Sequence, residues 1–223
     1  MNAKHFLLGI ELAIVRAVRM RAMKGQHVVI TGTPGTGKTT VARYLAKKNG
    51  WRLISLSKFA FKNGGIRYFD PETGSFVIDP NRIKRSLNRL LRRNNDHRCI
   101  VEGCDAHVLV EPELVTHVFV LRCNPIELVQ RMLRSGYSRD KILANVEAEM
   151  IDFCLWEAIN RFGQERVFEI DTTERSPEEV AGIINDIIEG RQQSGVGNVD
   201  WLSQYEDIIR AVSDLLGVSP LQA

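Results

Sequence analysis

The chain has 223 residues, of which 44% are hydrophobic and 26% are charged, and these fractions exclude a chain that is disordered throughout. The net charge of +3 is too small to require a nucleic-acid partner, and four widely spaced cysteines predict neither a zinc site nor a disulfide scaffold. The longest apolar stretch, residues 6–15, contains Glu11 and is far shorter than the roughly 20 residues that span a bilayer, so we expect a cytoplasmic protein with no membrane partner.

Short apolar runs of strand length alternate with helical patterns along most of the chain. In the first half of the chain we expect a helix over 3–23, a strand over 27–31, a helix over 38–48, a strand over 51–56, irregular structure over 57–78 with a turn at 70–74, and a helix over 80–93. In the second half we expect strands over 99–101 and 117–121, a helix from 124, a long helix over 138–162, a strand over 166–170 and a helix from 176 to about 190. This alternation predicts an α/β protein in which a five-stranded parallel sheet is covered by helices on both faces.

Several of these helices carry recognisable start signals. Asp79 is expected to cap a helix whose first position is Pro80. Asn124 precedes a helix with Glu127 at the capping-box position, Ser138 is expected to cap the long helix, and Ser176 opens the helix after the last strand.

The end of the chain is separated from these elements by residues 191–198, which have the composition of a linker. A final helix over about 200–216 carries an apolar face, which consists of Trp201, Tyr205, Ile208, Val212 and Leu215. We expect this helix to dock on the preceding domain or on a second copy of it, and a partner-binding helix is the alternative.

The most specific motif lies between the first strand and the helix after it. Residues 32–39 read GTPGTGKT and match G-x-x-x-x-G-K-[ST] at every fixed position. Glycines let backbone N–H groups converge on phosphate oxygens, and the N-terminus of the following helix favours the same negative charge. Lys38 is therefore expected to reach the phosphates of a nucleoside triphosphate, and the Thr39 hydroxyl to join the shell of a Mg²⁺ ion.

The reaction is narrowed by what accompanies this loop. The chain lacks the Asn-Lys-x-Asp sequence with which GTPases read guanine, and it is short for a motor ATPase, so small-molecule kinases remain. Such enzymes need a second acid near the metal. Glu102 follows the strand 99–101 at the end that faces the ligand in parallel sheets, which makes it the candidate; a solvent-facing Glu is the alternative.

The basic residues that could neutralise the transferred phosphoryl group follow the strand over 117–121. Arg122, Arg131 and Arg134 are the candidates, and the last two share a helix face just before Gly136. We interpret this segment as a hinged lid over the phosphates, with a solvated basic face as the alternative.

Three blocks of the sequence together resemble one family. The loop GTPGTGKTT, the block VEGCDAH and the block LRCNPIELVQRMLRSGYSRDKILANVEAEM are similar to the adenylate kinase isoenzyme 6 family, which has archaeal members and a eukaryotic nuclear form. The similarity covers roughly residues 25–190, which leaves an N-terminal helical extension at 1–24 and a linker with a C-terminal helix at 191–223.

This resemblance implies a three-layer P-loop NTPase fold with an acceptor-nucleotide region near 53–76 and a small lid near 133–143. It implies Mg²⁺-dependent transfer from ATP to AMP, ATPase activity, and a role in small ribosomal subunit maturation through a ribosomal protein or rRNA. Family contacts with ATP carry over to Gly32, Gly35, Gly37, Lys38, Thr39 and Thr40, with Arg134 from the lid. Catalytic roles would fall to Lys38, Arg131 and Arg134, and metal binding to Thr39 and Glu102.

The chain departs from the family pattern at a few positions. Relatives tend to have acid-x-His after the third strand, whereas this chain has Cys104 in place of the His, with His107 further on. Ser135 replaces the lid Arg that usually precedes Gly-Tyr. Lys62 and Arg67 are the candidates for an acceptor-site cation, with ordinary surface charges as the alternative.

Two features allow a different interpretation of function. Residues 82–98 carry seven basic side chains and one acid, which form either a solvated helix face or a surface for RNA. His107 is either a structural histidine or a catalytic one. We therefore predict a nucleoside monophosphate kinase with AMP as acceptor, and keep a ribosome-assembly ATPase and a P-loop kinase of another metabolite as alternatives.

Overall fold

The computed structural model describes residues 26–70, 75–94 and 97–217. The expected five-stranded parallel sheet is confirmed, with the strand order β2-β5-β1-β6-β7. Its strands are β1 (His27–Gly32), β2 (Arg52–Ser55), β5 (Cys99–Glu102), β6 (Val115–Arg122) and β7 (Val167–Asp171). Every residue of β1, β5 and β6 is buried, as continuous apolar strands between two helical layers require.

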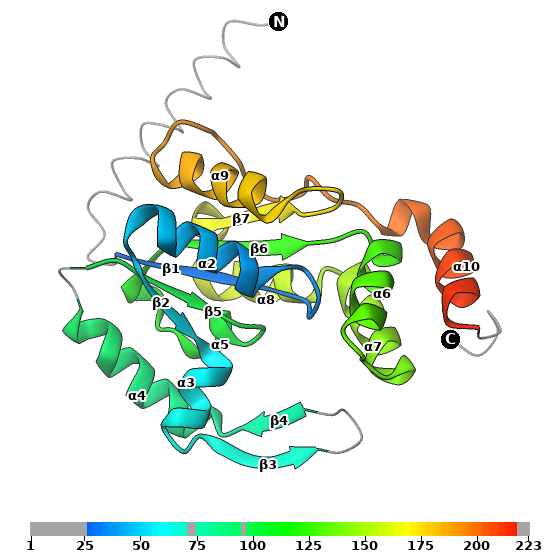
Figure 1. Cartoon of the computed structure of the whole chain (residues 1–223). Helices are drawn as coiled ribbons and strands as arrows, with labels where there is room; N and C mark the ends of the chain where they lie inside the picture. The colour runs from blue at the N-terminus through cyan, green and yellow to red at the C-terminus, as the bar shows by residue number, and fades with distance from the viewer. Residues whose placement is uncertain (1–25, 71–74, 95–96, 218–223) are drawn as a thin grey trace, which may run out of the picture.

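Helices cover both faces of the sheet, each over its own apolar cluster (Figure 1). One cluster lies under α2 (Lys38–Asn49) and α9 (Pro177–Ile188). The other lies under α4 (Pro80–Arg93), α5 (Ala106–Leu109) and α8 (Phe153–Phe162). Alternate residues of β1 point to opposite clusters, so the central strand holds the two layers together.

A third apolar cluster lies beyond the carboxyl ends of the strands. It is formed by α6 (Pro125–Arg134), α7 (Arg139–Met150) and α10 (Tyr205–Leu216), which Figure 1 shows grouped at one end of the sheet. The expected docking of the last helix is therefore seen, on α6 of the same chain. Its apolar face differs in part from the prediction, because Tyr205 and Leu215 are exposed and Leu216 is buried instead.

The prediction of irregular structure over 57–78 is wrong. Residues there form α3 (Leu56–Lys62) and an antiparallel hairpin of β3 (Ile66–Asp70) and β4 (Ser75–Ile78). Phe69 pairs with Phe76 across the hairpin, and their rings meet edge to face at 5.2 Å. This cross-strand contact stabilises a hairpin that carries few buried side chains, which is why its sequence lacks a clear apolar alternation.

The long helix expected over 138–162 is broken in two. Asp152 has a left-handed backbone conformation, with φ of 58°, between α7 and α8. Ser138 caps α7 as expected, Asp79 caps α4, and Ser176 forms a complete capping box with Glu179. The box expected at Asn124 is incomplete, because the Glu127 carboxylate instead accepts hydrogen bonds from Arg131 and from the Glu174 amide.

Short 3₁₀ helices occur at Pro112–Leu114, Gln164–Arg166 and Leu202–Gln204, the last of which occupies the start of the predicted final helix. Among the described residues, none of the helices has the length and apolarity to cross a bilayer. The helix expected over 3–23 and most of the turn at 70–74 lie outside the described residues.

Candidate active site

The phosphate loop, residues 32–39, connects β1 to α2 at the carboxyl edge of the sheet. Gly32 has a φ of 132°, and a Cβ atom there would lie 2.3 Å from the Leu121 carbonyl oxygen of β6, so the close pairing of these strands requires glycine. A Cβ at Gly35 would lie 2.8 Å from Leu128 Cδ1 and 3.0 Å from Met132 Cγ, so α6 packs directly on the loop.

Lys38 is buried at the base of this loop. Its Nζ donates to the Thr33 carbonyl oxygen at 2.8 Å, and the Thr36 hydroxyl donates to the same oxygen at 2.9 Å. The Thr33 hydroxyl in turn donates to Glu149 Oε2 at 2.6 Å. Lys38 is thus held by its own loop through one of the three N–H donors of its ammonium group.

The predicted pair of metal ligands comes together. The Thr39 hydroxyl donates to Glu102 Oε2 at 3.0 Å, and Glu102 is buried at the end of β5, directly beside β1. Hydroxyl and carboxylate oxygens suit Mg²⁺, which is commonly held by one or two protein oxygens together with substrate phosphates and water. The described residues contain no group of three His, Cys, Asp or Glu side chains that could hold a metal ion.

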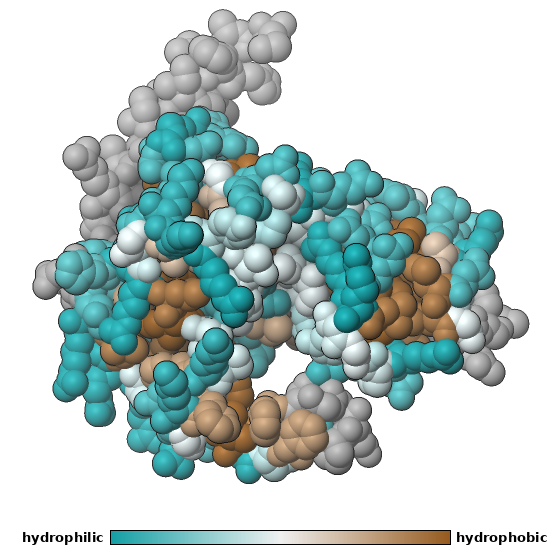
Figure 2. Space-filling view, viewed as in Figure 1, coloured by the Kyte–Doolittle hydropathy of each residue, from teal (hydrophilic) through white to brown (hydrophobic). Residues whose placement is uncertain are grey.

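A cleft of about 1,080 Å³ opens in front of these residues. One wall is the phosphate loop with Glu102 and Cys104, another is the hairpin and α3, and the third runs from Ser135 to Lys141. Figure 2 shows the hydrophobic side chains of the hairpin gathered at the rim of this hollow. Phe61 and Phe76 line the cleft and are 71% and 56% exposed, so two aromatic rings are available for contact with a ligand.

The predicted lid arginines lie outside this cleft. Arg131 Nη2 donates to Glu127 Oε1 at 2.6 Å and to the Thr172 carbonyl at 2.8 Å, and Arg131 does not line the cleft. Arg134 is exposed and contacts the Gln130 carbonyl. The reason is that α6 presents its apolar side, with Leu128 and Met132, to the loop.

The cation that the lid does bring to the cleft is Lys141, whose Nζ lies 4.7 Å from the centre of the Tyr137 ring. Lys141 was not among the site residues predicted from the sequence. Its position three residues after the capping residue Ser138, on the first turn of α7, could have indicated it.

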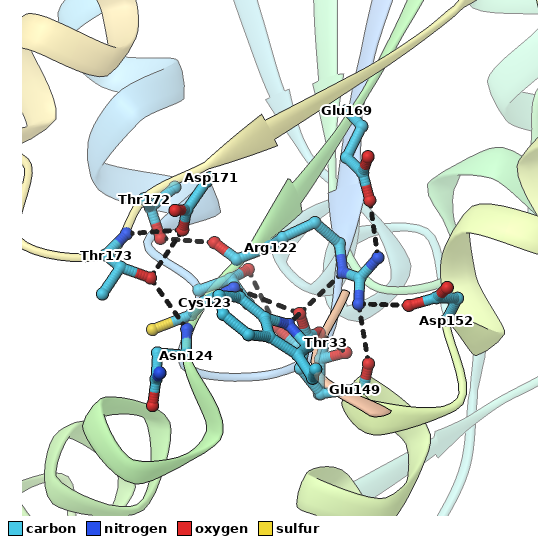
Figure 3. A network of polar contacts seen from close by, with 12 residues as sticks. Thr33, Arg122, Cys123, Asn124, Glu149, Asp152, Glu169, Asp171, Thr172 and Thr173 are labelled. Atoms are coloured by element: carbon cyan, nitrogen blue, oxygen red, sulfur yellow. Dashed lines mark hydrogen bonds and ion pairs between the residues drawn. The ribbon is translucent and has the colours of Figure 1, made fainter. Parts of the chain in front are cut away.

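Arg122, the third basic candidate, is buried in an ionic network rather than exposed in the cleft (Figure 3). Its guanidinium donates to Glu149 Oε1 and to Glu169 Oε1, each at 2.7 Å, and also contacts Asp152. Burial by itself would lower the pKa of Arg122, but the carboxylates of Glu149 and Asp152 outweigh it and raise the pKa. The role expected for Arg122 at the transferred phosphoryl group is therefore wrong.

The remaining candidate residues from the sequence do not line the cleft. His107 is buried, with Nδ1 2.8 Å from the Thr31 hydroxyl and Nε2 2.9 Å from Glu157 Oε2, so it does not line the cleft. Arg67 is exposed near Asp79, and neither Arg67 nor Lys62 lines the cleft. The basic side of α4 is exposed as expected, and its Arg92 contacts Glu111 and Glu113.

Comparison with known proteins identifies related chains and a related fold. A family model described as "AAA domain" matches residues 28–152. The chain is 37% identical over 182 residues to a protein of Pyrococcus abyssi named "Putative adenylate kinase", which covers 82% of this chain and 94% of that protein. A protein of the same name from Archaeoglobus fulgidus is 39% identical over 186 residues, covering 82% and 95%. The crystal structure of TT1252 from Thermus thermophilus matches in fold alone, with a TM-score of 0.50, 18% identity, and coverage of 76% of this chain and 99% of that one.

Proposed function

The chain belongs to the family of these archaeal proteins, and we propose that it is a P-loop kinase that transfers the γ-phosphoryl group of ATP to AMP and yields two molecules of ADP. The observation that carries the proposal is the arrangement of Lys38, Thr39 and Glu102 at the floor of a cleft that has two further walls. One wall can cover the donor nucleotide, and the other offers aromatic surface to an acceptor base.

The residues of the chain act by position and charge. Lys38 and the loop amides would bind the phosphates of ATP, and Thr39 with Glu102 would hold Mg²⁺, which supplies positive charge to the phosphate oxygens when bound. The oxygen of the acceptor phosphate is already anionic, so no general base is needed and alignment of the two nucleotides is the main requirement. Phe61 and Phe76 are proposed to contact the acceptor base.

The lid is proposed to add positive charge. Lys141 already lines the cleft, whereas Arg131 and Arg134 stay predictions, because Arg131 would have to leave Glu127 and Thr172 to reach a phosphate. Lid closure is a common way to exclude water from phosphoryl transfer.

The test is ADP formation from ATP and Mg²⁺ with AMP, CMP, GMP and UMP as separate acceptors, beside a reaction without acceptor. We expect AMP to raise the rate well above the reaction without acceptor. Equal rates with and without every nucleoside monophosphate would contradict the proposal.

Hydrolysis of ATP without an acceptor is the second candidate. It is favoured by one observation: among the described residues that line the cleft, Lys38 and Lys141 are the only cations, and no arginine lines it. The reaction without acceptor measures this activity directly. Its stimulation by a ribosomal protein or by rRNA would support the assembly role that the sequence suggested.

A further inference from the structure

The C-terminal segment from Asn198 to Leu216 follows the last strand and helix of the sheet domain, yet it contacts residues that hold the phosphate loop. Trp201 is 8% exposed, and its indole Nε1 donates to Glu149 Oε1 at 3.4 Å. The amide of Asn198 donates to Glu169 Oε2 at 2.8 Å. The segment therefore enters the buried ionic network of Figure 3 at two of its carboxylates.

Glu149 is the centre of this arrangement. Its carboxylate is buried and accepts from donors on separate parts of the chain, which are the Thr33 hydroxyl, Arg122 Nε, the Cys123 amide and Trp201 Nε1. A buried carboxylate is costly unless its oxygens are paired, so each donor helps to fix where the group lies. The position of Glu149 then determines the position of Thr33.

Thr33 transmits that position to the catalytic lysine. Its hydroxyl donates to Glu149 Oε2 at 2.6 Å, while its carbonyl accepts from Lys38 Nζ at 2.8 Å. A continuous series of hydrogen bonds therefore joins Trp201 to Lys38 through Glu149 and Thr33. We propose that the C-terminal segment positions the phosphate loop, with Trp201 acting through Glu149 and Thr33 on Lys38.

Packing provides a second connection between the segment and the loop. Ile208 and Val212 of α10 are buried in the same apolar cluster as Leu128 and Met132 of α6, the two side chains that face Gly35. The apolar cluster of α6, α7 and α10, which we call the lid cluster, thus takes its third helix from beyond residues 191–198. This inference rests on the proposed function only in assigning the binding of nucleotide phosphate to Lys38.

The experiment measures binding rather than phosphoryl transfer. The full chain is titrated by calorimetry with a non-hydrolysable ATP analogue and Mg²⁺, for the wild type, Trp201→Phe, Thr33→Val and the double variant. Phe keeps the aromatic ring and removes the indole N–H, and Val keeps the shape of Thr and removes its hydroxyl. Leu215→Ala is the matched control, since it trims an exposed apolar side chain of the same helix that belongs to neither connection.

We expect Trp201→Phe and Thr33→Val each to weaken binding about fivefold, as the typical net contribution of one hydrogen bond suggests. Because both variants break the same connection, the affinity of the double variant should also fall by about fivefold rather than by the product of the two effects. Leu215→Ala should leave affinity within about twofold. Unchanged affinity in Trp201→Phe, independent effects that multiply, or an affinity loss in Leu215→Ala equal to that of Trp201→Phe would overturn the proposal.

A reciprocal measurement uses the wild-type chain alone. If the segment positions the loop, nucleotide must slow hydrogen exchange at the Trp201 indole and in α10, because coupling between two sites acts in both directions. Unchanged exchange there would contradict the proposal even if the variants fail to fold. A wild-type chain that binds the analogue but does not phosphorylate AMP would contradict only the proposed acceptor. A wild-type chain that does not bind the analogue would contradict both the proposed function and the role of the C-terminal segment.

Discussion

The two sides of the cleft are built in different ways. On the side of the phosphate loop, backbone geometry sets the site, since Gly32 packs against β6 and Glu102 ends a strand beside β1. On the lid side, position depends on side chains from α6, α7 and α10, which share a separate apolar cluster. A site set by the backbone can be recognised from a short motif, whereas a site set by tertiary packing cannot.

The largest effect is expected on the side of the phosphate loop. Lys38→Ala removes the only buried lysine at the loop, and we expect a loss of phosphoryl transfer of about 10³-fold or more, as for other groups that stabilise developing charge. The measurement is ADP formation at saturating ATP. Lys47→Ala, at an exposed position later in α2, is the control and should keep its activity. Retained activity in Lys38→Ala would show that the phosphates bind elsewhere.

A smaller effect is expected at the metal pair. Glu102→Gln keeps an oxygen near Thr39 but removes the negative charge, so we expect about a 10²-fold loss of rate that higher Mg²⁺ concentration partly restores. The rate is measured across a magnesium titration. Glu113→Gln, on an exposed carboxylate that contacts Arg92, should titrate like the wild type. A Glu102→Gln enzyme with an unchanged magnesium requirement would assign this carboxylate a structural role.

The sequence predicts the side of the phosphate loop better than the lid side of the cleft. The loop, the five strands and the Thr39–Glu102 pair were predictable because each depends on local spacing and on the common edge of parallel strands. The burial of Arg122 was not, since its partners Glu149 and Glu169 lie 27 and 47 residues away. The hydrogen bond from Thr33 to Glu149 spans 116 residues and has no local signature.

Neither the hairpin nor the positions of Arg131 and Arg134 relative to the cleft could be predicted from the sequence, for related reasons. The hairpin is stabilised by the exposed pair Phe69 and Phe76, so its strands lack the apolar alternation that marks a half-buried strand. Arg131 lies three residues before Arg134 on α6, as the predicted shared helix face requires. The side of α6 that packs on the loop carries Leu128 and Met132, and Arg131 contacts the Thr172 carbonyl instead of lining the cleft. Helical spacing gives the relative directions of side chains, and only tertiary contacts give the absolute ones.

The separation of the lid cluster can be tested by matched core substitutions. Ile184 in α9 and Ile208 in α10 are both fully buried, and Ile→Val at either should cost about 0.5–1.5 kcal/mol. If the lid cluster opens as its own unit, Ile208→Val will speed hydrogen exchange in α6, α7 and α10 but not in β1. Ile184→Val should speed exchange in β1 as well. Identical exchange patterns in the two variants would show that the lid and the sheet unfold as one.

The smallest effect is expected on the pH dependence of stability, which should differ between the sheet and the lid cluster. Within residues 123–150 and 199–217, which supply the lid cluster, the sequence has no histidine, whereas His27 is buried in β1 with Nε2 3.0 Å from the Leu91 carbonyl and Nδ1 accepting from the Cys99 amide at 3.1 Å. Burial is the main cause that lowers the pKa of His27; the Leu91 contact opposes it and Arg98 adds to it. As the pH falls below about 6.5, the unfolded chain gains a proton that the folded chain does not.

Stability from His27 is therefore complete above pH 6.5 and is lost as the pH decreases toward the lowered pKa, by at most about 1.4 kcal/mol per pH unit. The measurement is the urea midpoint of the wild type and of His27→Gln at pH 7.5 and 5.5, with His97→Gln, at an exposed position, as control. Comparison with His27→Gln cancels the other titrating groups, including Glu169, whose pKa is raised by burial. The wild type should lose about 1 kcal/mol more than His27→Gln. Equal losses would mean that the strand end accepts a charged imidazole, and that the sheet is less rigid at this end than at the cleft.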